Sequence, residues 1–117
     1  MRNLEPVLEN WGTQVRKGLL ELCILNAIAG GRCYGYDIVK TLRAADGLLI
    51  GEGTIYPILS RFRALKLVDA SIEESAEGPP RKNYRLTAQG RQCLNEMNAA
   101  WNRVQNAVDQ LRSEKPS

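Results

Sequence analysis

The chain has 117 residues, a hydrophobic fraction of 44%, a charged fraction of 25% and a net charge of +3. This size suits one domain with a modest core, and the composition is that of an ordinary globular protein. The sequence contains no histidine and no Cys-x-x-Cys motif, which removes most zinc sites and the Ser-His-Asp and Cys-His classes of catalysis. We therefore expect no enzymatic activity, no metal site and no cofactor.

The apolar runs are shorter than the ~18 residues of a membrane span, and the first residues lack the apolar core of a signal peptide. We expect a cytoplasmic protein with no membrane partner. Three cysteines, Cys23, Cys33 and Cys93, lie far apart in the sequence. The sequence leaves open whether Cys33, which follows a Gly-Gly pair, senses redox state or is an ordinary thiol.

The start of the chain has apolar residues at helical spacing: Leu4, Val7, Leu8, Trp11 and Val15. Gly12 predicts a break, so residues 1–12 should form a short helix that bends into a second helix over 13–29. That second helix is apolar almost all round after Glu21, which indicates the buried centre of the domain. A third helix is predicted over 34–45.

After an apolar turn at 48–50, a fourth helix is expected to start at Gly53 or Thr54. Thr54 is suited to be its N-cap, and Pro57 would fall in the first turn, where the missing N–H costs little. The helical pattern turns one apolar set inward, namely Ile55, Ile58, Leu59, Phe62 and Leu65. It leaves another set for the outer surface, namely Thr54, Tyr56, Ser60, Arg61 and Arg63.

A β-hairpin is predicted directly after this helix. Val68, Ala70 and Ile72 alternate with polar residues, residues 76–80 form a turn, and Tyr84 belongs to the returning strand. Basic residues follow the turn. A helix followed by a basic hairpin is the order of a winged helix-turn-helix, in which the helix reads a DNA groove and the hairpin lies along the backbone.

The last helix is predicted from residue 88 to about residue 113, with Thr87 as its cap. It carries an apolar seam with the spacing 3, 4, 3, 4, 3, formed by Leu94, Met97, Trp101, Val104, Val108 and Leu111. Such a heptad seam, beyond an already complete domain, most simply packs against a copy of itself. We therefore predict a homodimer with these six residues in its interface.

The predicted fold is thus mainly α with a small β-hairpin. Residues 13–87 form the winged helix-turn-helix domain, and residues 88–117 form the C-terminal dimerisation helix with a short tail. Two copies of the reading helix related by a two-fold axis require an operator that is an inverted repeat.

Four motifs in order resemble the PadR family of bacterial transcriptional regulators, in its smaller branch with a single C-terminal helix. They are Arg-Lys-Gly-Leu-Leu-Glu-Leu-Cys-Ile-Leu at 16–25, Tyr-Gly-Tyr-Asp-Ile at 34–38, Gly-Thr-Ile-Tyr-Pro-Ile-Leu-Ser-Arg at 53–61, and Gly-Pro-Pro-Arg-Lys-Asn-Tyr-Arg-Leu-Thr-Ala-Gln-Gly at 78–90. The chain departs from the family pattern at Arg63, Lys66 and Asn83. Lys66 stands where the family often has glycine.

The resemblance implies a winged-helix repressor that binds double-stranded DNA and is dimeric through the last helix and the N-terminal helix of residues 1–12. It also implies release by a small aromatic or other apolar effector in some members. The residues expected to bind DNA are Lys17, Thr54, Tyr56, Arg61, Arg81 and Lys82. Lys17 is included because it would begin the buried helix, whose amide end attracts phosphate. A winged-helix module that docks a protein in place of DNA is the alternative function.

Trp101 matches the tryptophan on which some relatives stack planar ligands, so a planar or phenolic effector is the implied ligand. Trp11 would form another wall of the same cavity. From the residues alone, a tryptophan at a heptad position is also compatible with plain core packing, and both readings of Trp101 stay open.

Overall fold

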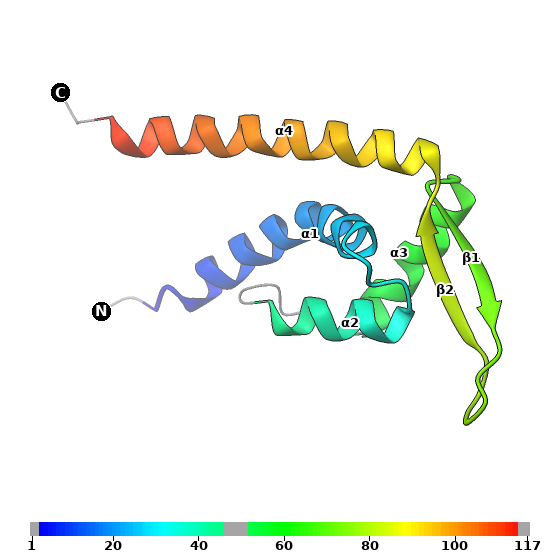
Figure 1. The fold of residues 1–117 in the computed structure, drawn as a ribbon. Coiled ribbons are helices and arrows are strands. Elements are labelled where there is room, and N and C mark those ends of the chain that lie inside the picture. Colours follow the sequence, from blue (N-terminus) through cyan, green and yellow to red (C-terminus); the bar gives the residue numbers. More distant parts are fainter. Residues whose placement is uncertain (1–2, 46–51, 115–117) are drawn as a thin grey trace.

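The computed structural model describes residues 3–45 and 52–114 (Figure 1). The helices are α1 (Glu5–Ala29), α2 (Gly35–Ala44), α3 (Glu52–Ala64) and α4 (Ala88–Ser113), and the strands are β1 (Val68–Glu73) and β2 (Arg81–Leu86). The predicted fold, mainly α with one hairpin, is confirmed. The turn predicted at 48–50 lies outside the described residues. Within the described ranges, no helix is long and apolar enough to cross a membrane.

The core forms where the apolar faces of the four helices meet the base of the hairpin. Its fully buried side chains include Ile24 and Leu25 of α1, Ile38 of α2, and Ile55 and Leu59 of α3. The late half of α1 is the central helix of this core, as its nearly continuous apolar sequence predicts. Burial of these branched side chains holds α1, α2 and α3 together.

The first half of α1 extends beyond the core (Figure 1). The predicted break at Gly12 is wrong, because α1 is one continuous helix of 25 residues. A glycine inside a helix costs about 1 kcal/mol relative to alanine but does not by itself end the helix. The apolar side chains of this half are exposed to solvent: Leu4, Val7, Leu8, Trp11 and Val15.

Helix α3 begins slightly earlier than predicted. It starts at Glu52, so Thr54 is inside the helix and its predicted role as N-cap is wrong. Pro57 therefore lies beyond the first turn and is a proline inside the helix. Its ring nitrogen cannot donate to the carbonyl four residues earlier, which leaves that carbonyl without its helical partner.

The end of α3 is a Schellman motif. The Lys66 N–H donates to the Arg63 carbonyl at 3.0 Å, and the Leu67 N–H donates to the Phe62 carbonyl at 2.9 Å. Lys66 takes the left-handed conformation that this motif requires, with φ of 62°. Glycine is the residue that takes this conformation at the lowest cost. Leu65 lies past the end of the helix and is 53% exposed, so its predicted inward position is wrong.

The hairpin pairs β1 and β2 antiparallel, with Val68 opposite Leu86 at the base and Glu73 opposite Arg81 at the outer end. Val68 is only 1% exposed, whereas Ile72 is 69% exposed. Alternation puts Ile72 on the same face as Val68 but does not bury it, because the hairpin projects beyond the helices (Figure 1) and leaves Ile72 in solvent. We call this hairpin the wing.

Helix α4 is tied closely to the end of α3 through four residues that we call the α3–α4 joint: Lys66, Leu67, Thr87 and Gly90. The Thr87 hydroxyl oxygen caps α4 by accepting from the Gly90 N–H at 2.9 Å and donates to the Lys66 carbonyl at 2.7 Å. A Cβ atom on Gly90 would stand 1.9 Å from the Leu67 carbonyl oxygen. Only glycine therefore fits at this point of the helix.

Candidate nucleic-acid interface

The outward positions predicted on α3 are all exposed in the structure: Thr54, Tyr56, Ser60, Arg61 and Arg63. The apolar positions Ile55, Leu59 and Phe62 of the same helix are buried, so α3 presents a polar and basic surface along its length. A short amphipathic helix of this kind is what a helix-turn-helix places in a DNA groove.

Tyr56 lies against the start of α2. A Cβ atom on Gly35 would be 2.8 Å from Cε1 of the Tyr56 ring, so glycine at this position leaves room for the ring to lie where it does. Tyr34 is the N-cap of α2 and gives no side-chain hydrogen bond to its first turn. The amides of an uncapped first turn attract anions, because they carry the positive end of the helix dipole.

A cleft of about 740 Å³ lies between α2, α3 and the wing. We call it the tyrosine cleft, because all four tyrosines of the chain are among its lining residues, which are Tyr34, Gly35, Tyr36, Asp37, Tyr56, Arg81, Lys82 and Tyr84. Arg81 and Lys82 bring positive charge from β2, and Asp37 brings negative charge from α2. Tyrosine hydroxyls, basic side chains and helix-start amides are the groups that bind a nucleic-acid backbone.

The wing is joined to the segment before α2 by a hydrogen-bond network around Glu73. The Tyr34 hydroxyl donates to Oε2 of Glu73 at 2.5 Å, and the Asn83 amide donates to Oε1 at 2.6 Å. The Arg81 guanidinium lies 5.7 Å from the centre of the Tyr34 ring, within the range of a cation–π contact. The backbone adds a hydrogen bond from the Tyr84 N–H to the Cys33 carbonyl at 2.6 Å.

These contacts change the acidity of the groups involved. The hydrogen bond from Tyr34, together with that from Asn83, holds the pKa of the Glu73 carboxyl below its ordinary value of 4.5. The same bond to Glu73 raises the pKa of the Tyr34 phenol above 10.0. Glu73 is therefore ionised and Tyr34 is neutral over the whole physiological pH range.

Three of the six residues predicted to bind DNA, Tyr56, Arg81 and Lys82, come together at the tyrosine cleft. Arg61 points elsewhere and forms an ion pair with Glu21 of α1. The two side chains are 54% and 32% exposed, and an exposed pair of this kind stabilises a fold by about 0–1 kcal/mol. The guanidinium can therefore leave Glu21 for another anion, and the role of Arg61 stays a prediction.

Lys17 does not occupy the position that was predicted for it. Helix α1 begins at Glu5, so Lys17 is in the middle of a helix and its amide is not at a helix end. The reason for expecting a phosphate there is therefore wrong. The Lys17 side chain is exposed, and a direct contact of its ammonium group with DNA stays a prediction.

Sequence reasoning missed Tyr34, Tyr36, Glu73 and Asn83 as members of the site. The available signal was the Tyr-Gly-Tyr motif at 34–36, directly before an amphipathic helix. Its glycine marks a close approach to another element, and its two tyrosines mark the surface beside it. The hydrogen bond between Glu73 and Tyr34 could not be predicted, because the two residues are far apart in the sequence and no spacing pattern connects them.

The residues predicted for the dimer interface divide into two groups. Leu94 is 5% exposed in the chain's own core, so its prediction as an interface residue is wrong. Met97 and Trp101 are half-buried against the same core, while the seam beyond them, namely Val104, Val108 and Leu111, is exposed. Trp11, the second predicted effector residue, is 65% exposed.

All three cysteines, Cys23, Cys33 and Cys93, are half-buried free thiols. Across residues 3–45 and 52–114, no group of three or more histidine, cysteine, aspartate or glutamate side chains is placed to hold a metal ion. The backbone carbonyl of Cys33 accepts the hydrogen bond from β2. Cys33 therefore lies where the segment before α2 meets the wing.

Comparison with known proteins places this geometry in a family. The family model described as "Transcriptional regulator PadR-like family" matches residues 24–96, more than half of the chain. The structure of a PadR-like transcriptional regulator from Bacillus cereus has a TM-score of 0.79 and 35% identity, and the match covers 87% of this chain and 99% of that one. A PadR-family transcriptional regulator from Eggerthella lenta has a TM-score of 0.77 and 26% identity, with 95% of this chain and 96% of that one covered.

A curated protein also matches most of the chain. An uncharacterized protein X from Lysinibacillus sphaericus is 28% identical over 99 residues, which are 83% of this chain and 91% of the relative. The family resemblance of the four sequence motifs is confirmed by the family model and the two solved structures. The chain belongs to the PadR-like family of transcriptional regulators.

Proposed function

We propose that this protein is a sequence-specific, DNA-binding repressor that acts in the cytoplasm as a two-fold homodimer. The observation that carries the proposal is the meeting of Tyr56, Arg81 and Lys82 with the start of α2 at the tyrosine cleft. With α3 in a groove of double-stranded DNA, the cleft receives the backbone phosphates at the edge of that groove. Thr54 and Arg61 extend the contact along the outer face of α3.

Dimerisation is supported by two exposed apolar faces. One is the first half of α1, with Leu4, Val7, Leu8, Trp11 and Val15, and the other is the late seam of α4, with Val104, Val108 and Leu111. Soluble monomers rarely leave such faces in water, so a second copy is the natural cover. The two reading helices are then related by a two-fold axis, and the operator is an inverted repeat with half-sites roughly 34–36 Å apart.

Release from DNA is proposed to follow binding of a small planar or phenolic effector at Trp101. Trp101 is half-buried at the point of α4 where the covered part of the seam ends and the exposed part begins. A planar ring stacks on an indole, and Trp11 offers a second indole from α1. Binding there favours one angle between the long helices, which changes the spacing of the two reading helices and hence the affinity for DNA.

The DNA-binding part is tested by the salt dependence of binding to DNA from the promoter of the protein's own gene. Fluorescence anisotropy should show a linear fall of log K with log salt between about 0.05 and 0.2 M, because lysine and arginine displace counterions. Arg81→Ala and Lys82→Ala should each reduce that slope by about 1.

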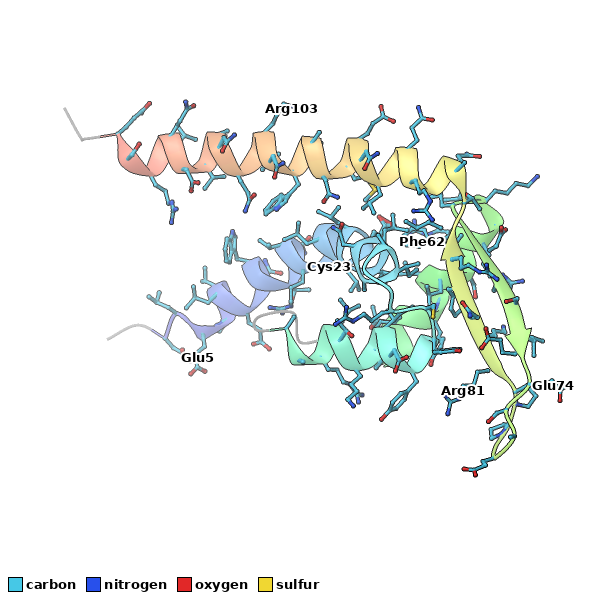
Figure 2. The ribbon with its side chains drawn as sticks, in the orientation of Figure 1. Glu5, Cys23, Phe62, Glu74, Arg81 and Arg103 are labelled. Atoms are coloured by element: carbon cyan, nitrogen blue, oxygen red, sulfur yellow. The ribbon has the colours of Figure 1, made fainter. Side chains whose placement is uncertain are left out.

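The matched control for these variants is Arg103→Ala. Arg103 is an exposed arginine on the outer side of α4, away from the wing (Figure 2), and its loss should leave the slope unchanged. Binding that does not depend on salt, or a slope that responds equally to all three variants, contradicts this interface and favours a protein partner.

The effector part is tested by tryptophan fluorescence in a Trp11→Phe background, which leaves Trp101 as the emitter. A panel of planar dyes and phenolic acids should contain compounds that quench this emission and release the protein from DNA. Trp101→Leu should abolish the release. If release persists in Trp101→Leu, the effector site lies elsewhere and Trp101 is only part of the core.

A further inference from the structure

The wing contains an acid where a DNA-binding element would be expected to avoid one. Glu73 is the last residue of β1 and pairs with Arg81 across the hairpin. A carboxylate beside the DNA backbone repels phosphate and partly cancels the neighbouring arginine. Its presence there needs a reason other than contact with DNA.

Both oxygen atoms of this carboxylate are occupied by neutral donors. Oε2 accepts from the Tyr34 hydroxyl and Oε1 accepts from the Asn83 side-chain amide, at 2.5 Å and 2.6 Å. The Asn83 side chain donates to Glu73 through its NH2 group. The amide oxygen of Asn83 is buried and has no hydrogen-bond partner among the described residues. Hydrogen bonds to an ionised acceptor are roughly twice as strong as those between neutral groups.

These bonds act at the part of the wing that apolar packing does not reach. Val68 at the base is buried, but Ile72 beside Glu73 is 69% exposed. A two-stranded hairpin is marginally stable on its own, so its outer half needs another attachment to keep one direction. Glu73 provides it by linking β1 to Tyr34, the residue that begins α2.

Arg81 depends on the same attachment. Its guanidinium lies over the Tyr34 ring, and Figure 2 shows it on the side of the wing that faces α2, whereas Glu74 points away. Holding Tyr34 through its hydroxyl therefore also fixes the surface on which Arg81 rests. Glu73 thus influences both walls of the tyrosine cleft without lining it.

We propose that Glu73 is a positioning residue for DNA binding, which rests on the function proposed above: its carboxylate locks the wing onto the start of α2 and so sets Arg81 and Lys82 in place. The lowered pKa of Glu73 agrees with this role, because the carboxylate stays charged while it accepts from Tyr34 and Asn83. The lock strengthens DNA binding even though its central group carries the same sign of charge as DNA.

The direction in which a substitution of Glu73 changes the affinity for DNA separates this role from simple electrostatic repulsion. Glu73→Ala and Glu74→Ala each remove one negative charge from adjacent positions of the wing. Glu74→Ala should bind promoter DNA up to roughly threefold more tightly, as expected for loss of one exposed repulsive charge. Glu73→Ala should bind roughly tenfold more weakly, because two hydrogen bonds to a charged group are lost. Both affinities are measured by anisotropy at the same salt concentration.

Two further variants identify the mechanism. Glu73→Gln removes the same charge as Glu73→Ala but keeps an oxygen that accepts from Tyr34, so it should recover part of the lost affinity. In a double-mutant cycle, Lys82→Ala should cost less in the Glu73→Ala background than in the wild type, because the wing is already displaced. A general loss of stability would leave the cost of Lys82→Ala unchanged.

The outcomes distinguish this proposal from the one on which it rests. Wild-type protein without salt-dependent DNA binding overturns both. Wild-type binding as expected, together with Glu73→Ala binding as tightly as Glu74→Ala, overturns only the role of Glu73. If circular dichroism shows that Glu73→Ala is unfolded, Tyr34→Phe replaces it: this variant changes no charge and keeps the ring, and unchanged affinity for DNA overturns the lock.

Discussion

The two ends of α4 carry the same apolar seam in different surroundings. Near the start, Leu94 is 5% exposed and belongs to the core, whereas near the end Leu111 is 69% exposed. The spacing of apolar residues is the same at both ends, and the helix is continuous between them (Figure 1). Periodicity therefore marks the face of a helix that has to be covered, while the size of the domain decides how much of that face the domain covers itself.

The division falls near Trp101. Before it, α4 packs on α1, and Asn26 and Asn98 join the two helices by reciprocal amide hydrogen bonds of 3.0 Å. Beyond it, Val104 and Val108 are exposed. One seam therefore serves folding in its first part and, in our proposal, association in its second part.

The sharpest way to test this division is to make the same truncation at both ends. Leu94→Ala should lower the free energy of unfolding by about 2–5 kcal/mol, because it leaves a cavity in the core. Leu111→Ala should change it by no more than about 0.5 kcal/mol in the isolated subunit. Urea denaturation measures both, and sedimentation at several concentrations measures association. Equal losses of stability from the two variants would contradict the division.

The role of the exposed part of the seam in association can be tested separately. Val104→Asp combined with Val108→Asp should weaken the dimer roughly a hundredfold or more, because unpaired carboxylates would enter an apolar interface. Asn106→Asp with Gln110→Asp is the matched control, since it adds the same charge on the opposite face of α4. Sedimentation equilibrium should show monomers only for the first pair. Identical behaviour of both pairs would show that the seam is not the interface.

A smaller effect is expected at the joint where the seam begins. Lys66 has a left-handed backbone conformation, with φ of 62°, which is unfavourable for a residue with a side chain. Lys66→Gly should therefore raise the free energy of unfolding by about 1 kcal/mol. Lys66→Ala, which removes the charge but keeps the Cβ atom, should give no such gain. A gain from both variants would assign the effect to charge.

The smallest effect concerns the wing, which repeats the contrast seen along α4: a buried base and an exposed outer half. The pKa of Glu73 is lowered in the folded state, so its contribution to stability is present above pH 4.5 and is lost as the pH falls further. The difference in unfolding free energy between the wild type and Glu73→Ala should shrink as the solution is acidified below pH 4.5. A difference that is constant with pH would show that the carboxylate charge is not involved.

Much of the fold follows from local patterns. Apolar patterns identified the buried second half of α1 and the buried face of α3, and the alternation around Val68 and Tyr84 identified the wing. The alternating pattern does not bury Ile72, where the wing extends beyond the core, because alternation predicts a buried face only if something packs against it. The predicted break at Gly12 was wrong because the free-energy cost of one glycine inside a helix is smaller than the cost of ending a long helix there.

The candidate site was harder to predict because its residues come from distant parts of the chain. Tyr56, Arg81 and Lys82 were identified by their place on a helix and beside a turn. Tyr34 and Glu73 were not, because their bond spans 39 positions of the sequence and depends on how the wing lies against α2. Spacing rules describe neighbours along one element and carry no information on such a pair.

The α3–α4 joint has a consequence for exchanging parts between relatives. A Cβ atom on Gly90 would collide with the backbone of Leu67, and Thr87 holds the end of α3 through the Lys66 carbonyl. A chimera that replaces α4 should therefore keep every residue through Gly90 and fuse the foreign helix after it. A graft made before Thr87 would lose these contacts, and the new helix would no longer be fixed in direction relative to α3 and the wing, however well the two parts fold alone.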